Sequence, residues 1–141
     1  MERVVVYTAL FGNKDKLWSV PPVASRGAKY VAFVDSPRPE AGLWTEYNGR
    51  TILVHGTEDT YTVRPTWEQR VVKPKYGNRR TARYCKALSH TMFPDASITI
   101  WLDANIRLRA PVSIALKWLG AFEFAAFRQV ESRYRNPCRR S

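Results

Sequence analysis

Strand-like apolar runs that end in polar or acidic residues constrain the fold of this chain more than any other feature. Val4 to Tyr7 is one such run, and similar runs occupy residues 29–34 and 98–102. The runs at 29–34 and 98–102 are separated by a long connection and a segment with helical spacing. Strands that alternate with a helix and long connections are typical of the α/β class, with a mainly parallel sheet flanked by helices.

Turn signals place the remaining strands. Asn48-Gly49 predicts a turn that joins strands at 43–47 and 51–54 into a hairpin. Residues 57–77 contain two prolines and no sustained period, so we expect a long loop there. Residues 20–23 include two adjacent prolines and are not expected to lie in a helix interior.

Two helices and a last strand are predicted in the second half of the chain. Asn78 is expected to cap a helix whose apolar residues recur at helical spacing as far as Met92. Pro111 is expected to open a helix that runs to Leu119, because proline is favoured in the first helical turn. Residues 122–127 are largely apolar and predict a further strand.

Length and charge narrow the class of protein. The 141 residues predict one domain at 1–128, followed by a flexible basic tail at 129–141. Lys and Arg outnumber Asp and Glu by 23 to 12, and the resulting net charge of +11 favours polyanionic partners. No apolar run approaches the ~20 residues of a membrane span and no signal peptide is evident, so we expect a cytoplasmic protein. Cys85 and Cys138 lack the spacing of a metal or disulfide motif, which predicts free thiols.

Polar residues at the strand ends form the first candidate site. Ligands of open α/β sheets bind beyond the carboxyl ends of the strands, where this chain has Asp35 and, after the 98–102 run, Asp103 and Asn105. The oxygen atoms of an Asp-x-Asn step suit a hard cation such as Mg²⁺, which usually shares its coordination shell with substrate phosphates. The alternative is structural, with Asp103 capping a turn and Asn105 in a left-handed conformation.

Basic residues on the predicted helix form the second candidate site. Arg79, Arg83 and Lys86 are spaced by four and three residues, so they share one side of the helix, next to Arg80. These side chains suit anionic phosphates, because arginine can donate two parallel hydrogen bonds and lysine acts as a point charge. The alternative is the solvated face of an ordinary surface helix.

Aromatic and basic residues are mixed in the predicted loop. The set consists of Tyr61, Trp67, Arg70, Lys73, Lys75 and Tyr76. Such a mixture suits single-stranded nucleic acid, a base-binding or lid loop of an enzyme, or packing onto the core. The sequence contains no P-loop, dinucleotide-binding or nucleophile-elbow motif and no common nucleic-acid-binding signature. His55 and His90 stand alone in the sequence and are expected to be structural.

An ordered set of motifs across roughly residues 4–110 resembles a known family. The motifs are Val-Val-Tyr-Thr-Ala-Leu-Phe-Gly-Asn-Lys-Asp-Lys-Leu at 5–17, Phe33-Val34-Asp35, Thr-Ala-Arg-Tyr-Cys-Lys at 81–86, His90, Phe93-Pro94, and Ile-Trp-Leu-Asp-Ala-Asn-Ile at 100–106. In this order they resemble a family of glycosyltransferase-like proteins with bacterial, phage and plant members, formerly catalogued as a domain of unknown function.

The resemblance implies a GT-A, Rossmann-like fold and transfer of a sugar from a nucleotide-diphosphate donor to a hydroxyl acceptor, which could be a glycan, a lipid or another molecule. It implies that Asp103 and Asn105 hold a divalent metal, Mn²⁺ or Mg²⁺, on the donor diphosphate. The donor-binding residues that it implies are Tyr7, Thr8 and Ala9 beside the nucleotide, Asp35 at the base or ribose, and Arg83 and Lys86 at the diphosphate. It nominates no catalytic residue.

Two departures from the family pattern bear on activity. Asn105 stands in place of the second acid of an Asp-x-Asp step, which leaves one negative charge fewer for the cation. Gln129-Val130 follow Phe127-Arg128 where the family usually has His-Pro, so the acceptor half is expected to be missing and a truncated transferase to be weakly active. Two other functions stay open: a small basic nucleic-acid-binding protein, and a hydrolase that acts on a lipid or glycan.

Overall fold

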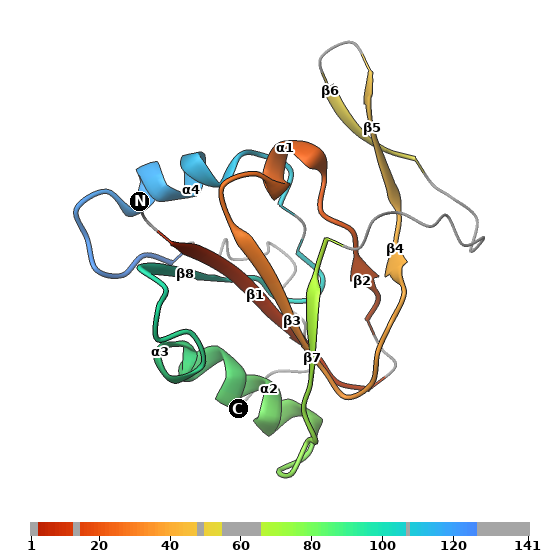
Figure 1. Ribbon diagram of the computed structural model, residues 1–141, viewed down its shortest axis with the longest axis vertical. Coiled ribbons are helices and arrows are strands. Elements are labelled where there is room, and N and C mark those ends of the chain that lie inside the picture. Colours follow the sequence, from red (N-terminus) through yellow and green to blue (C-terminus); the bar gives the residue numbers. More distant parts are fainter. Residues whose placement is uncertain (1–2, 13–14, 48–49, 55–65, 107, 127–141) are drawn as a thin grey trace, which may run out of the picture.

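A parallel four-stranded sheet forms the centre of the protein (Figure 1). The computed structural model describes residues 3–12, 15–47, 50–54, 66–106 and 108–126. Its elements are β1 (Val4–Leu10), β2 (Leu17–Trp18), α1 (Pro22–Ser25), β3 (Lys29–Val34), β4 (Glu40–Ala41), β5 (Leu43–Tyr47), β6 (Arg50–Val54), β7 (Glu68–Val71), α2 (Asn78–Ala87), α3 (Ser89–Met92), β8 (Ile98–Trp101) and α4 (Val112–Leu119). The sheet has the order β7-β3-β1-β8, and every pairing in it is parallel, which confirms the predicted α/β class.

Strand β1 lies inside the sheet because its sequence is apolar on both faces. All seven of its residues are buried, as is typical of a parallel strand covered on both sides. Tyr7 pairs with Val31 of β3 and with Trp101 of β8, so the carboxyl ends of these three strands lie at the same edge of the sheet.

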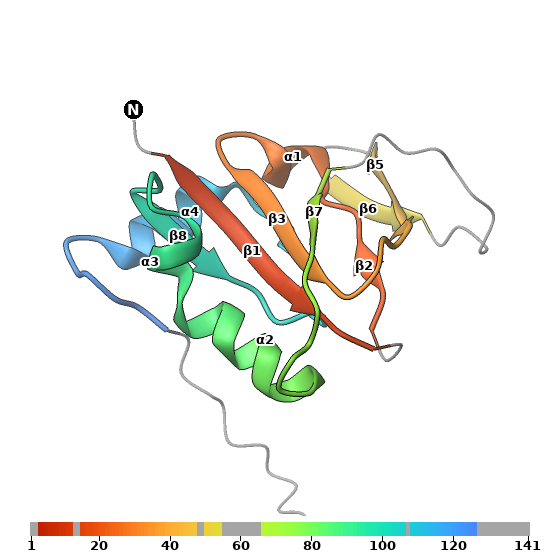
Figure 2. The same ribbon diagram turned by 60° about the horizontal axis from the view of Figure 1, so that its bottom comes forward.

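Helices cover both faces of the sheet. Helices α1 and α4 lie on one face, where Ala24 and Val112 join the core cluster of Val6. Helices α2 and α3 lie on the other face, where Cys85 packs in the cluster of Tyr7. Figure 2 shows α2 running along β1 on this second face. Successive side chains of β1 therefore point to opposite faces of the sheet, one toward α1 and α4 and the next toward α2 and α3.

The paired strands predicted at 43–47 and 51–54 are confirmed, whereas the predicted turn at Asn48-Gly49 lies outside the described residues. Strands β5 and β6 pair antiparallel, with Leu43 opposite Val54, and they project away from the central sheet (Figure 1). Strands β2 and β4 form a separate two-stranded parallel pair. Helix α1 begins at Pro22, so the paired prolines open a single helical turn that the sequence analysis had not predicted.

The loop predicted at 57–77 is wrong in part, because β7 lies within it as an edge strand of the central sheet. The segment Glu-Gln-Arg-Val has no apolar run, since an edge strand needs fewer buried side chains than a central one. Glu68 instead forms ion pairs with Lys29, at 3.4 Å, and with Arg70, at 3.1 Å. Trp67 is buried against Tyr30 and belongs to the core, whereas Tyr61 falls outside the described residues.

The helix predicted from Asn78 to Met92 is two helices. Its N-cap is Gly77, not Asn78, because glycine adopts the positive φ of 82° that the turn into α2 requires. Leu88 leaves the helical region, with φ −106° and ψ 33°, and so separates α2 from α3. Its backbone N–H still bonds to the carbonyl of Tyr84 at 3.1 Å.

The end of the chain agrees with the predictions only in part. Helix α4 confirms the one predicted from Pro111 to Leu119, with Gly120 as its C-cap. The strand predicted at 122–127 is wrong over residues 122–126, which form no strand; the predicted tail at 129–141 lies outside the described residues. Within the described part of the chain, no helix has the length and apolar character needed to cross a bilayer.

Candidate functional site

The carboxyl edge of β1, β3 and β8 gathers most of the residues singled out from the sequence. The alternation of β1 sends Tyr7 and Ala9 to the face under α2 and Thr8 to the opposite face. The backbone N–H of Leu102 donates to the Tyr7 carbonyl at 3.0 Å, so the pairing of β8 with β1 continues one residue past the strand. Asp103 follows at once and is exposed.

Tyr7 connects the sheet to helix α2. It is 3% exposed, and its hydroxyl donates to the backbone carbonyl of Lys86 at 2.7 Å. Its ring packs edge-on against Phe93 and Trp101, and burial raises the pKa of its hydroxyl. Tyr7 therefore holds the turn of α2 that carries Lys86 against the sheet, and its own side chain is closed to solvent.

Asp103 and Lys86 meet at the indole of Trp101. The indole Nε1 donates to Asp103 Oδ1 at 2.8 Å, and the Lys86 ammonium lies 5.8 Å from the centroid of the Trp101 ring. The cation contributes a cation–π attraction, while the indole N–H orients the carboxylate. One aromatic side chain thus contacts both an acidic residue that follows β8 and a basic residue of α2.

Asp103 and Asn105 lie in the same tight turn after β8. The backbone N–H of Ile106 donates to the Asp103 carbonyl at 2.8 Å, which closes the turn over residues 103–106. Both side chains are exposed. The carboxylate of Asp103 bonds to Trp101 and not to a backbone N–H of the turn, so its position at the edge does not depend on capping.

Metal binding by Asp103 and Asn105 stays a prediction, which the chemistry of their side chains allows. Carboxylate and amide oxygens are suitable ligands for Mg²⁺ or Mn²⁺. Across the described residues, however, no group of three or more His, Cys, Asp or Glu side chains is placed to hold a metal ion. A cation held by Asp103 and Asn105 would therefore take its other ligands from water and from phosphate oxygens.

The other predicted donor residues are placed differently. Arg83 is exposed on α2, one turn before Lys86. Asp35 is engaged within the protein: its Oδ2 accepts from the Gly12 N–H at 2.8 Å and its Oδ1 from the Arg38 guanidinium at 2.7 Å. These hydrogen bonds hold the pKa of the Asp35 carboxyl below its ordinary value, the Arg38 contact having the largest effect. A contact of Asp35 with a base or ribose stays a prediction.

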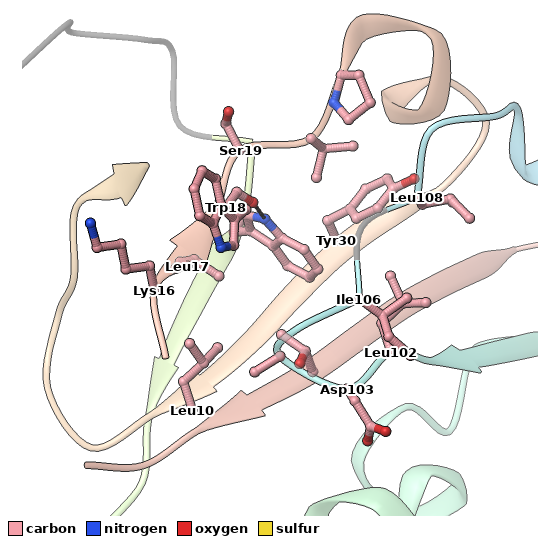
Figure 3. Close-up of a pocket in the computed structure, with 15 residues that line it drawn as sticks. Leu10, Lys16, Leu17, Trp18, Ser19, Tyr30, Leu102, Asp103, Ile106 and Leu108 are labelled. Carbon is pink, nitrogen blue, oxygen red and sulfur yellow. Dashed lines mark hydrogen bonds between the residues drawn. The ribbon is translucent and has the colours of Figure 1, made fainter. Parts of the chain in front are cut away.

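A small cavity lies on the side of the sheet opposite α2 (Figure 3). Thr8 is one of the residues that line it. The cavity has a volume of about 20 Å³, which is room for one water molecule. Trp18, Tyr30 and Leu102 contribute to its wall, while the Asp103 carboxylate in Figure 3 points away from these rings. Thr8 is 3% exposed, and its hydroxyl has no hydrogen-bond partner among the residues that the structure describes. As it stands the cavity is too small for a nucleobase.

Two residues of the site were not predicted from the sequence. Trp101 could have been found, since residues two apart in a strand point the same way and Trp101 is two residues before Asp103. Arg38 could not, because its guanidinium reaches the carbonyls of Gly12 and Asp15 as well as Asp35. Only the fold brings the segment after β1 and the segment after β3 together.

Comparison with protein families identifies the chain. The TOD1/MUCI70 glycosyltransferase-like domain matches residues 1–130. This chain belongs to that family. The match confirms the resemblance inferred from the ordered motifs and agrees with the parallel sheet flanked by helices. Comparison with curated proteins and with solved structures gave no significant match.

Proposed function

We propose that this TOD1/MUCI70-family protein binds a nucleotide-sugar donor at the carboxyl edge of its sheet and transfers the sugar to a hydroxyl acceptor. The observation that carries the proposal is the meeting of Asp103 and Lys86 at Trp101. This pair combines a carboxylate for a cation with an ammonium for a phosphate, at the edge where open α/β sheets bind ligands. Family membership supports a glycosyltransferase function in general.

The diphosphate of the donor would lie between the turn at 103–106 and helix α2. Lys86 and Arg83 are one turn apart on α2, so both can face a phosphate group on the same side of the helix. A divalent cation held by Asp103 and Asn105 would offset the charge that develops on the diphosphate as the bond to the sugar breaks. The two cationic side chains would stabilise the same charge, most strongly in the transition state.

The nucleoside would lie beside the end of β1. Tyr7 and Ala9 are buried and serve by holding the strand and α2 in place. The backbone at this edge and the unpartnered hydroxyl of Thr8 are the groups of β1 that a ligand or an ordered water could reach. The roles of Thr8 and Asp35 toward the base or ribose are part of the proposal.

Calorimetric titration of the purified protein with UDP, GDP and CDP tests the donor site. Each nucleotide is titrated with and without Mn²⁺, into the wild type, Asp103→Ala and Lys86→Ala. Asp95→Ala is the matched control, because Asp95 is also an exposed aspartate but lies before β8, away from the carboxyl edge. We expect one nucleotide to bind in a metal-dependent way, and Asp103→Ala to abolish the effect of the metal.

The outcomes are distinct. Binding of one nucleotide that needs both Mn²⁺ and Asp103, and that Asp95→Ala leaves unchanged, supports the proposal. Lys86→Ala should weaken binding with or without the metal, because it removes a phosphate contact and no metal ligand. Absence of nucleotide binding by the folded protein, or cleavage of a glycan or lipid without any nucleotide donor, would overturn the proposal.

A further inference from the structure

A surface rich in unpaired cations and exposed tyrosines begins where β7 ends. We define the α2 basic surface as Lys73, Lys75, Tyr76, Arg79, Arg80 and Tyr84. All six side chains are exposed. They come from the β7–α2 connection and the first turns of α2, which adjoin in Figure 2. Between Gln69 and Pro94 the sequence contains no Asp or Glu.

The cations of this surface are not neutralised within the described protein. The ion pairs of the described residues join Lys29 and Arg70 to Glu68, and Arg38 to Asp35. None of them involves the four cations of the α2 basic surface. Like charges held this close repel one another, so a chain of anionic groups laid along them would relieve that repulsion and release its own counterions.

The turn before α2 presents its lysines in a fixed arrangement. The N–H of Lys75 donates to the Lys73 carbonyl at 2.8 Å, and the N–H of Gly77 donates to the Pro74 carbonyl at 3.1 Å. Gly77 then caps helix α2, which begins with Asn78 and continues with Arg79 and Arg80. The lysines and arginines are therefore carried by a hydrogen-bonded turn and a helix.

The tyrosines give the surface a second property. Tyr76 is 65% exposed and Tyr84 is 50% exposed, whereas Tyr7 and Tyr30 are buried in the core. Tyr84 lies four residues after Arg80 and so beside it on the helix. An exposed ring next to a cation can stack on a nucleobase while the cation meets the adjacent phosphate. An acidic polysaccharide or an anionic lipid headgroup would use only the charge.

We propose that the α2 basic surface binds single-stranded nucleic acid. The phosphates would contact the two lysines and two arginines, and unpaired bases would stack on Tyr76 and Tyr84. Because every base has a face to stack, the binding would tolerate any sequence. The surface does not include Arg83 or Lys86, the α2 residues proposed to bind the donor diphosphate, so it goes beyond the donor site; Arg79 shares their side of the helix.

Fluorescence anisotropy with a labelled oligothymidylate of about 20 nucleotides tests the proposal. Four phosphate contacts predict a slope of about −3 in the logarithm of the binding constant against the logarithm of salt concentration. Arg79→Glu with Arg80→Glu should weaken binding at least ~10-fold and make the slope shallower by about 1.4. The control is Arg26→Glu with Lys117→Glu, which changes the net charge equally at exposed residues of the other helical layer.

A tyrosine variant separates nucleic acid from polyanions in general. Tyr76→Ala with Tyr84→Ala should weaken oligothymidylate binding by about fivefold or more for each ring, and leave heparin binding unchanged because heparin has no bases. Circular dichroism checks that each variant is folded. The proposal is overturned if the tyrosine variant binds oligothymidylate as the wild type does, or if both charge variants weaken binding equally.

Discussion

Removing the contact between Asp35 and Arg38 tests which interactions stabilise the carboxyl edge of the central sheet. The Asp35 carboxylate accepts from the N–H of Gly12, just past β1, and from Arg38 in the loop after β3. The Arg38 side chain is 14% exposed and that of Asp35 is 27% exposed. Both groups are therefore partly removed from water, and the charged pair ties together the ends of two neighbouring strands.

The expected cost of Asp35→Asn follows from these contacts. Asparagine keeps an acceptor for the Gly12 N–H, but it loses the charge that strengthens both hydrogen bonds, and hydrogen bonds to charged groups contribute about 1.5–3 kcal/mol each. Breaking a fully buried pair costs about 3–5 kcal/mol, and this pair is only partly buried. We expect the free energy of unfolding to fall by about 2 kcal/mol, with a fall in Tm of about 7 °C.

The loss should depend on pH in a defined direction. The pKa of Asp35 is lowered in the folded protein from its ordinary value of 3.8. The stabilisation by the Asp35 carboxylate is therefore complete above about pH 3.8, and it is lost as the pH falls through the lower pKa of the folded protein. Wild type and Asp35→Asn should differ by about 2 kcal/mol near neutral pH and converge below the folded pKa, where the carboxyl is protonated.

Urea unfolding followed by circular dichroism, at pH about 7 and at pH about 2, measures both quantities. Asp95→Asn is the control, since Asp95 is exposed and forms no ion pair with the described residues. A change of less than about 0.5 kcal/mol at neutral pH, or a difference that persists unchanged in acid, would refute the assignment of Asp35 to this structural role.

Three further substitutions or reactions test other contacts. Tyr7→Phe removes the hydrogen bond to the Lys86 carbonyl and should lower the free energy of unfolding by about 1 kcal/mol in urea titrations; no change would mean that this bond does not secure α2. Gly12→Ala should cost about 1–2 kcal/mol, because φ is +83° and the new Cβ would lie 2.9 Å from Asn78 Nδ2. If Asn78→Ala restored full stability to Gly12→Ala, the backbone strain would be refuted. Burial raises the pKa of the Cys85 thiol, so peptide mapping should find Cys85 alkylated by iodoacetamide in denaturant but not in the native protein at neutral pH; rapid native labelling would contradict its burial.

The sequence predicted three strands of the central sheet well because their residues are typical of strands. β1 and β3 are largely apolar and buried, and such a run has few alternatives to a covered parallel strand. β8 lies at an edge of the sheet and is only partly buried, but its residues are β-branched or aromatic. The β5–β6 hairpin could also be predicted from the sequence, since Asn-Gly favours the tight turn that joins two strands. β7 was missed because its residues carry an edge-strand pattern, and only its pairing with β3 identifies it.

The sequence by itself determined the fold class, the family and the acidic residues that follow β3 and β8, because apolar runs and ordered motifs are local properties of the chain. Only the tertiary structure decided how those residues are used. In the structure Asp35 binds Arg38, and Tyr7 is buried in the core. Lys86 and Asp103 both contact Trp101. The contacts of Tyr7 and Trp101 with Lys86 join strands to helix α2, and their distances depend on register and helix packing, which no local pattern of residues specifies.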